Sequence, residues 1–94
     1  MERYNWSRLN ALQVGRFAEY FAKMEFALYG YEVFTSEVDD RGIDFIIRKD
    51  GRFCEVQVKS IRGFNYVFFP KDKFPASRLA AVVVLHEGQS PEFY

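Results

Sequence analysis

The chain is poor in the residues that stabilise disulfide-rich or zinc-dependent small domains. Its 94 residues include one cysteine and one histidine. This excludes an intramolecular disulfide and a structural zinc site built from a His/Cys cluster. A single cysteine favours a reducing compartment. No apolar run reaches the ~18 residues that span a bilayer, and residues 1–6 lack the apolar segment of a signal peptide. We therefore expect a cytoplasmic protein that does not enter a membrane.

Charge of neither sign is in excess. Thirteen Lys and Arg balance thirteen Asp and Glu, so no overall field draws the chain to nucleic acid. An acidic metal site would nevertheless offset basic residues elsewhere in this count. The chain has no internal repeat and no low-complexity linker, and its length is typical of one domain over residues 1–94.

The spacing of apolar residues predicts one long helix followed by strands. The helix is expected from Leu9 to Tyr29, with Gly30 as its C-cap. Strands are expected at 31–38, on both sides of a turn at 50–51, and at 65–69, 79–85 and 92–94. This order predicts an α/β fold in which an N-terminal helix packs on a mixed β-sheet with a central hairpin. The stripe expected to face the core is Val14, Phe17, Phe21, Met24 and Leu28.

The clearest local signal is a β-hairpin that turns at Asp50-Gly51. Asp-Gly is typical of a type I′ turn, which needs positive φ at both central residues. A two-residue turn fixes the register, so Phe45 should face Val56 and Asp44 should face Gln57. Alternation along the strands then separates an apolar face (Phe45, Ile47, Cys54, Val56, Val58) from a polar face. On the polar face we expect four side chains to converge: Asp44, Glu55, Gln57 and Lys59.

These residues resemble the PD-(D/E)XK nuclease superfamily. The similarity is to its small, Holliday-junction-resolvase-like members, whose third motif reads Gln-X-Lys, as Gln57-Val58-Lys59 does here. Gly15 and Glu19 are similar to the first-helix motif Gly-x-x-x-Glu. Ile43 stands where the family has its proline, and Gln57 replaces the second acid. The resemblance covers residues 12–69.

The resemblance implies a restriction-endonuclease-like core and a metal-dependent nuclease that hydrolyses DNA phosphodiester bonds. Residues 61–77 leave little room for the family's second helix, so a minimal or truncated C-terminal part is expected. The implied cofactor is Mg²⁺ or Mn²⁺, bound by oxygen ligands. These would come from Asp44, Gln57, the Val58 backbone and a second carboxylate, either Glu19 or Glu55.

The remaining roles concern the phosphate. The resemblance implies that Lys59 orients the attacking water and stabilises developing charge. Basic residues near the site are candidates for phosphate contacts: Arg41, Arg48, Arg62 and Lys71. Periodicity alone places Glu19 opposite the Phe17/Phe21 stripe, on a solvated face.

Other interpretations stay open at this stage. The fold could serve as a non-catalytic module that binds nucleic acid or a protein, or the chain could be an aromatic-rich single-strand-binding barrel, which the long helix disfavours. Asp44 and Lys59 could form an ordinary exposed ion pair. Cys54 is expected to be a small buried hydrophobe, and His86 to lie at a strand end, in a surface or edge position. High aromatic content favours a homodimer or larger homo-oligomer, with candidate interface residues Phe64, Tyr66, Phe68 and Phe69.

Overall fold

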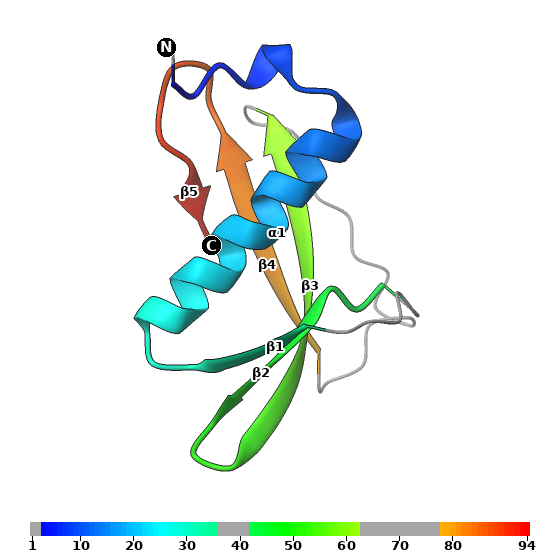
Figure 1. Cartoon of the computed structure of the whole chain (residues 1–94), viewed down its shortest axis with the longest axis vertical. Helices are drawn as coiled ribbons and strands as arrows, with labels where there is room; N and C mark the ends of the chain where they lie inside the picture. Colours follow the sequence, from blue (N-terminus) through cyan, green and yellow to red (C-terminus); the bar gives the residue numbers. More distant parts are fainter. Residues whose placement is uncertain (1–2, 36–41, 63–77) are drawn as a thin grey trace.

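The computed structural model describes residues 3–35, 42–62 and 78–94. They form one helix, a short 3₁₀ turn and one mixed sheet, and the helix crosses one face of that sheet (Figure 1). This confirms the α/β architecture with an N-terminal helix on a mixed sheet. In chain order the elements are η1 (Trp6–Arg8), α1 (Ala11–Leu28), β1 (Glu32–Thr35), β2 (Phe45–Lys49), β3 (Arg52–Arg62), β4 (Arg78–Leu85) and β5 (Glu92–Phe93).

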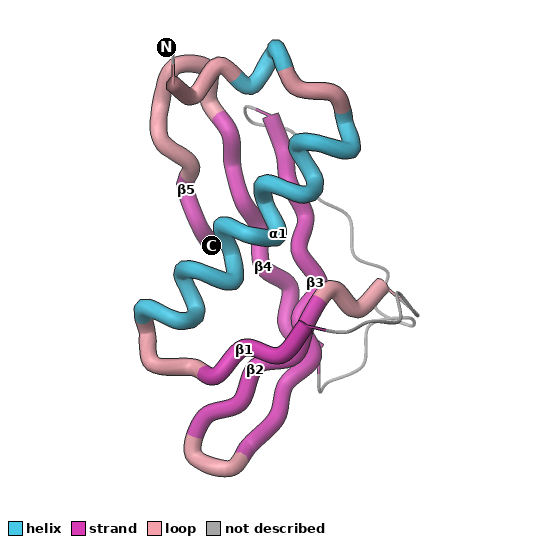
Figure 2. The backbone as a smooth tube through the Cα atoms, viewed as in Figure 1, coloured by secondary structure: helices cyan, strands magenta, loops and turns pink. Residues whose placement is uncertain are grey.

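Sheet order follows chain order, β1-β2-β3-β4-β5. Strands β3 and β4 pair in parallel, while the other neighbours are antiparallel. Figure 2 shows β2 and β3 extending together beyond the helix to the hairpin turn. The expected register is confirmed from Lys49–Arg52 through Phe45–Val56. Asp50 and Gly51 have φ values of 55° and 76°, as a type I′ turn requires.

Helix α1 begins at a capping box. The Asn10 side chain accepts from the Gln13 backbone at 2.8 Å, and the Gln13 side chain accepts from the Asn10 backbone at 2.9 Å. Together these bonds satisfy two of the donors that a helix N-terminus leaves unpaired. The helix ends at Leu28, and Gly30 follows in the left-handed region with φ 89°. The helix predicted from the sequence therefore begins two residues too early and ends one residue too late.

The buried stripe of α1 differs from the one expected from the sequence. Met24 and Leu28 are 58% and 79% exposed, so the prediction that they face the core was wrong. The buried residues instead repeat every four positions: Val14, Ala18, Ala22 and Phe26. Small alanine side chains let the helix backbone approach the sheet closely. A helical pattern based on large apolar residues does not detect them. Phe17 and Phe21 are half-buried and pack at the border of the core.

Two connected clusters fill the space between α1 and the sheet. One joins Ala22 and Phe26 to Phe45, Ile47, Val56 and Ala81, and the other joins Val14 and Ala18 to Trp6, Val83 and Leu85. Phe45 and Val56 are fully buried. The apolar face predicted for the hairpin is therefore the face that α1 covers.

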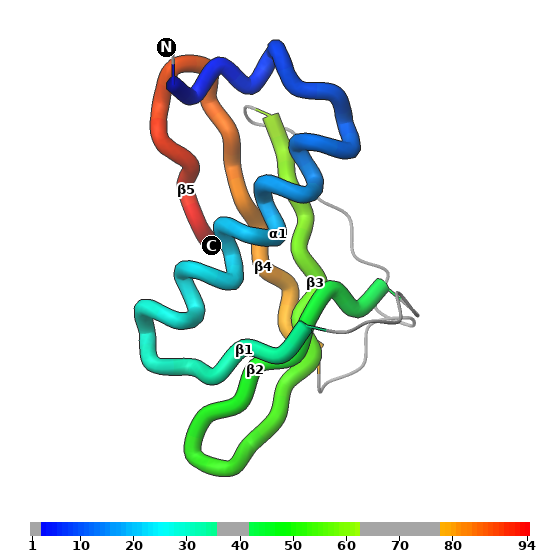
Figure 3. The backbone as a smooth tube through the Cα atoms, viewed as in Figure 1, coloured from blue at the N-terminus to red at the C-terminus, as the bar shows by residue number. Residues whose placement is uncertain are grey.

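The N-terminal residues lie beside the loop between β4 and β5 (Figure 3). Trp6 is 5% exposed, and its indole Nε1 donates to the His86 carbonyl at 2.9 Å. Gly88 N–H donates to the Tyr4 carbonyl at 2.8 Å. Trp6 also packs on Phe17, with ring centroids 4.9 Å apart. These bonds join segments about eighty residues apart in sequence.

The strand predicted at 65–69 and the four aromatic interface candidates lie outside the described residues. Within the described ranges, no helix combines the length and apolarity that crossing a bilayer would need.

Candidate functional site

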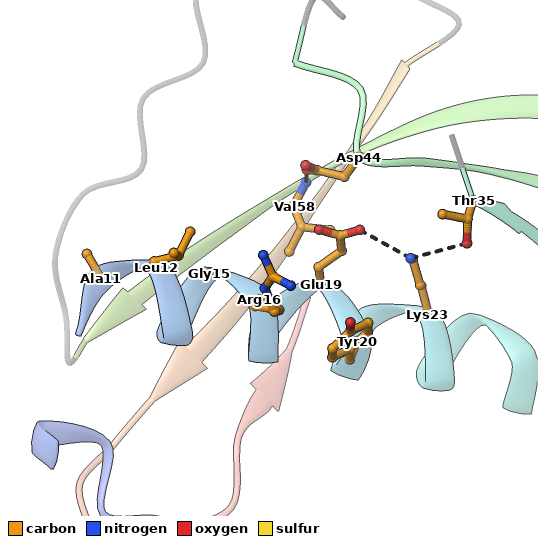
Figure 4. Close-up of a pocket in the computed structure, with 10 residues that line it drawn as sticks. All are labelled: Ala11, Leu12, Gly15, Arg16, Glu19, Tyr20, Lys23, Thr35, Asp44 and Val58. Atoms are coloured by element: carbon orange, nitrogen blue, oxygen red, sulfur yellow. Dashed lines mark hydrogen bonds and ion pairs between the residues drawn. The ribbon is translucent and has the colours of Figure 1, made fainter. Parts of the chain in front are cut away.

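A pocket of about 720 Å³ opens between α1 and the sheet (Figure 4). One row of helix residues spaced four apart runs along it: Ala11, Gly15, Glu19 and Lys23. A second row, also spaced by four, consists of Leu12, Arg16 and Tyr20. The sheet contributes Thr35, Asp44 and Val58. Residues from α1, β1, β3 and the segment before β2 therefore meet at one concave surface.

Asp44 lies where strand β2 begins and is attached to β3 by two hydrogen bonds. Its backbone N–H donates to the Val56 carbonyl at 2.9 Å. Its Oδ2 accepts the Val58 N–H at 2.6 Å. The Asp44 carboxylate thus takes the place of a backbone carbonyl of the neighbouring strand. It pairs the Val58 N–H of β3 beyond the point where the β2–β3 ladder ends. The Asp44 side chain is consequently held at one position on the pocket wall.

The polar residues of β3, namely Glu55, Gln57 and Lys59, do not line the pocket that contains the Asp44 carboxylate. The ladder ends at the Phe45–Val56 pair, and the Asp44 N–H bonds to Val56 instead of Gln57. A Cβ added at Gly42 would lie 3.3 Å from Gln57 Nε2, so the Gln57 amide lies against Gly42. The lining of this pocket includes Asp44 but not Glu55, Gln57 or Lys59.

Glu19 lies on the pocket wall formed by α1. Its carboxylate Oε1 is 3.1 Å from Lys23 Nζ, and its side chain is 32% exposed. The sequence pattern places it on the solvated side because the large Phe17 and Phe21 mark the apparent centre of the buried face. The true centre is Ala18 and Ala22, which moves Glu19 to the border of that face, beside the sheet.

Lys23 is a pocket residue that the sequence pattern does not indicate as functional. Its Nζ lies 3.1 Å from Glu19 Oε1 and 3.4 Å from Thr35 Oγ1, which links α1 to β1. The available signal was its position four residues after Glu19 and eight after Gly15, on the same helical row.

The basic candidates have different surroundings. Arg48 forms a two-nitrogen contact with Glu32 of β1, the shortest distance being 2.7 Å, and its guanidinium packs on the rings of Phe34 and Phe53. Arg62 donates to the Leu9 carbonyl at 3.0 Å. Arg41 and Lys71 lie outside the described residues.

The surroundings of Cys54 match the sequence prediction, whereas His86 lies at a strand end as expected but has a side chain that is only 18% exposed. Cys54 is half-buried on the apolar face of the hairpin, and burial, with the neighbouring Glu55 charge, raises the pKa of its thiol. His86 follows the last residue of β4, and its Nε2 lies 3.1 Å from Glu92 Oε1.

The donor chemistry of the pocket limits the cations that it could hold. Over the described ranges, no group of three or more His, Cys, Asp or Glu side chains is placed to hold a metal ion. Among the described residues, the pocket lining carries two carboxylates, Asp44 and Glu19. Mg²⁺ is commonly held by one or two carboxylates together with waters and substrate phosphates. The residues present therefore fit a weakly held Mg²⁺ or Mn²⁺ and do not fit a structural zinc ion.

Comparisons of the chain with protein-family models, with curated proteins and with solved structures found no significant match.

Proposed function

We propose that the protein is a metal-dependent nuclease that hydrolyses phosphodiester bonds in DNA, with its active site in the pocket under α1. One observation carries the proposal: carboxylates from two distant parts of the chain, Glu19 on α1 and Asp44 before β2, line the same pocket. They do so beside Val58, the middle residue of the Gln57-Val58-Lys59 motif. These are positions where the resemblance to the PD-(D/E)XK superfamily implies metal ligands.

Asp44, Glu19 and the Val58 carbonyl would hold the Mg²⁺ or Mn²⁺ ion. When bound, such an ion lowers the pKa of a water molecule and offsets the negative charge of the transferring phosphate. Mg²⁺ keeps several waters and shares its remaining positions with substrate phosphates. A pocket with two acids is therefore sufficient if the substrate completes the coordination, and affinity in the absence of DNA should be weak.

Backbone geometry supports Val58 as a third oxygen donor. An extended residue directs its N–H and its C=O to the same neighbouring strand. The Val58 N–H points to Asp44, with which it bonds at 2.6 Å. Its carbonyl therefore faces the same gap between β2 and β3. Asp44 and Val58 are fixed to each other by this bond, so the two oxygens need little reorganisation to bind one cation.

A specific observation favours a second candidate, a nuclease-like module that binds nucleic acid without cleaving it. The Glu19 carboxylate is already paired with Lys23 at 3.1 Å. A cation would have to compete with an ammonium group that is part of the protein. If the cation does not displace the Lys23 ammonium group from Glu19, the pocket keeps a charged surface but binds no metal.

The test is metal binding measured by calorimetry with Mn²⁺ and Mg²⁺. Asp44→Asn keeps an oxygen that can accept the Val58 N–H and removes the charge, so we expect affinity to fall by at least about tenfold, since one lost charge contact costs more than about 1.4 kcal/mol. Glu19→Gln should weaken binding as well. Glu55→Gln is the matched control, because Glu55 is a β3 carboxylate that does not line the pocket, and it should bind as the wild type does.

Cleavage of linear, branched and single-stranded DNA is then measured with each metal. We expect slow cleavage by the wild type and none by Asp44→Asn. Metal binding that is unchanged in Asp44→Asn would refute the metal site. Tight DNA binding with no cleavage of any substrate would favour the non-catalytic module.

A further inference from the structure

We infer that Lys23, on α1, is the residue that contacts the scissile phosphate, in the role that the sequence motif assigns to Lys59. The inference rests on the proposed function, because it names the phosphate-binding cation of the same pocket. It is carried by two observations: Lys23 lines the pocket and is largely buried there, whereas Lys59 belongs to the exposed part of β3.

The burial of Lys23 is unusual for a lysine on a helix surface. Its side chain is only 16% exposed. The ammonium lies 5.7 Å from the centroids of both the Tyr20 and Phe45 rings, whose faces attract a cation. Packing against these rings removes the ammonium from most of the solvent and lowers the local dielectric, which strengthens its electrostatic interactions compared with those of a fully solvated lysine.

The contacts of Lys23 hold its charge at the pocket wall. Glu19 lies 3.1 Å from Nζ, and Thr35 Oγ1 lies 3.4 Å from it. Figure 4 shows Glu19 and Lys23 pointing toward each other from successive turns of the helix, with Thr35 on the far side of the ammonium. Two fixed partners restrict a side chain that otherwise has large rotamer freedom.

The chemistry of the ammonium allows it to serve a phosphate without losing these partners. A lysine side chain carries three N–H donors and no acceptor. It can therefore hold the Glu19 carboxylate, the Thr35 hydroxyl and one phosphate oxygen at the same time. A metal on Glu19 and a phosphate on Lys23 would then occupy adjacent parts of one pocket.

Lys59 is the natural comparison. It lies in β3 at the register position of Val82, two residues after Gln57, and it is exposed. It is not part of the pocket lining that contains Asp44 and Glu19. Because Lys23 and Lys59 have the same side chain at different positions, the same substitution at each position separates the contribution of the helix lysine from that of the motif lysine.

The experiment measures binding of a fluorescein-labelled twelve-residue oligo(dT) by anisotropy, in metal-free buffer over a series of KCl concentrations. Each lysine–phosphate contact to a single strand contributes about 0.7 to the slope of log K against log[salt]. We expect Lys23→Met to lower that slope by about 0.7 and to weaken binding roughly tenfold. Lys59→Met should leave both unchanged, and Lys23→Arg should restore the slope.

Two further measurements keep the interpretation specific. The double variant Glu19→Gln/Lys23→Met should bind as weakly as Lys23→Met; recovery of binding would show that Lys23 acts only by neutralising Glu19 and would overturn the inference. Circular dichroism of each variant checks that the helix is intact. If Lys23→Met is unfolded, Lys23→Gln replaces it: this variant also removes the charge and should lower the slope by the same amount, and an unchanged slope would overturn the inference.

The result also separates this inference from the proposed function. A wild type that cleaves DNA, combined with an unchanged salt slope in Lys23→Met, overturns the inference and leaves the nuclease standing. A wild type that binds but never cleaves overturns the nuclease, and the slope still decides whether Lys23 contacts phosphate. A Lys23→Met variant that binds metal more tightly and cleaves faster would show that Lys23 blocks the cation, and would overturn the inference. A wild type that does not bind the oligonucleotide even at low salt overturns the inference, and the cleavage assays with metal decide the nuclease separately.

Discussion

Replacing Gly15 with alanine should stabilise the protein, although Gly15 lines the candidate active site. Gly15 lies within α1, and a Cβ added there would meet no heavy atom within 4 Å. Its backbone is helical, so alanine fits without strain. Glycine inside a helix costs roughly 0.5–1 kcal/mol relative to alanine, mostly through the entropy of the unfolded chain.

This free energy corresponds to a measurable shift in melting temperature. For a domain of this size, about 1 kcal/mol moves the Tm by roughly 4–8 °C, so Gly15→Ala should raise it by about 2–8 °C. The assay is thermal unfolding followed by circular dichroism at a helical wavelength, repeated with urea to obtain the free energy of unfolding. The slope against urea should be unchanged, because the folded structure is the same.

Gly51→Ala is the matched control. An added Cβ at Gly51 also meets nothing within 4 Å, but Gly51 has φ +76°. A side chain in that region costs about 1–2 kcal/mol, so Gly51→Ala should lower the Tm. The two substitutions add the same methyl group to equally open space and differ in backbone conformation alone. A lower Tm in Gly15→Ala would mean that the space above Gly15 is filled in solution, and the open pocket would then be wrong.

Two further predictions test the core and the thiol. Ala22→Leu should destabilise the protein by about 1–3 kcal/mol, because Ala22 has no exposed surface where α1 meets the sheet. Ala27→Leu, on the exposed side of α1, should change the free energy of unfolding by less than about 0.5 kcal/mol. Equal effects of the two substitutions in urea denaturation would contradict the close helix–sheet approach. Cys54 should react slowly with iodoacetamide near pH 8, since burial raises the pKa of its thiol and lowers its thiolate fraction. The rate should rise with pH and should be much higher in urea; an equal rate in the folded and unfolded protein would contradict the burial.

Local chemistry was enough to predict the hairpin and most of the elements. Asp50-Gly51 fixed the turn, and the turn fixed every pair as far as Phe45 and Val56. The apolar run ending at Leu85 was recognised as a strand, and the helix was located within two residues at each end. These features depend on turn residues, caps and periodicity, which act over a few positions of the chain.

The sequence also indicated both carboxylates of the described pocket lining, but for incomplete reasons. Asp44 was expected to face Gln57 across the ladder, which ends one pair earlier, at Phe45 and Val56. Its carboxylate bonds to the Val58 N–H instead. A side chain that replaces a strand carbonyl cannot be read from alternation, because alternation assumes that the ladder continues.

The sequence by itself determined the elements, the hairpin register and the residues available for chemistry. Only the tertiary structure decided which stripe of α1 is buried, and therefore that Glu19 and Lys23 border the sheet near Asp44. The physical reason is packing. Ala18 and Ala22 carry little hydrophobic weight in a sequence pattern, yet they are 1% and 0% exposed where the helix packs on the sheet. That contact rotates α1 about its axis and sets which polar side chains line the pocket.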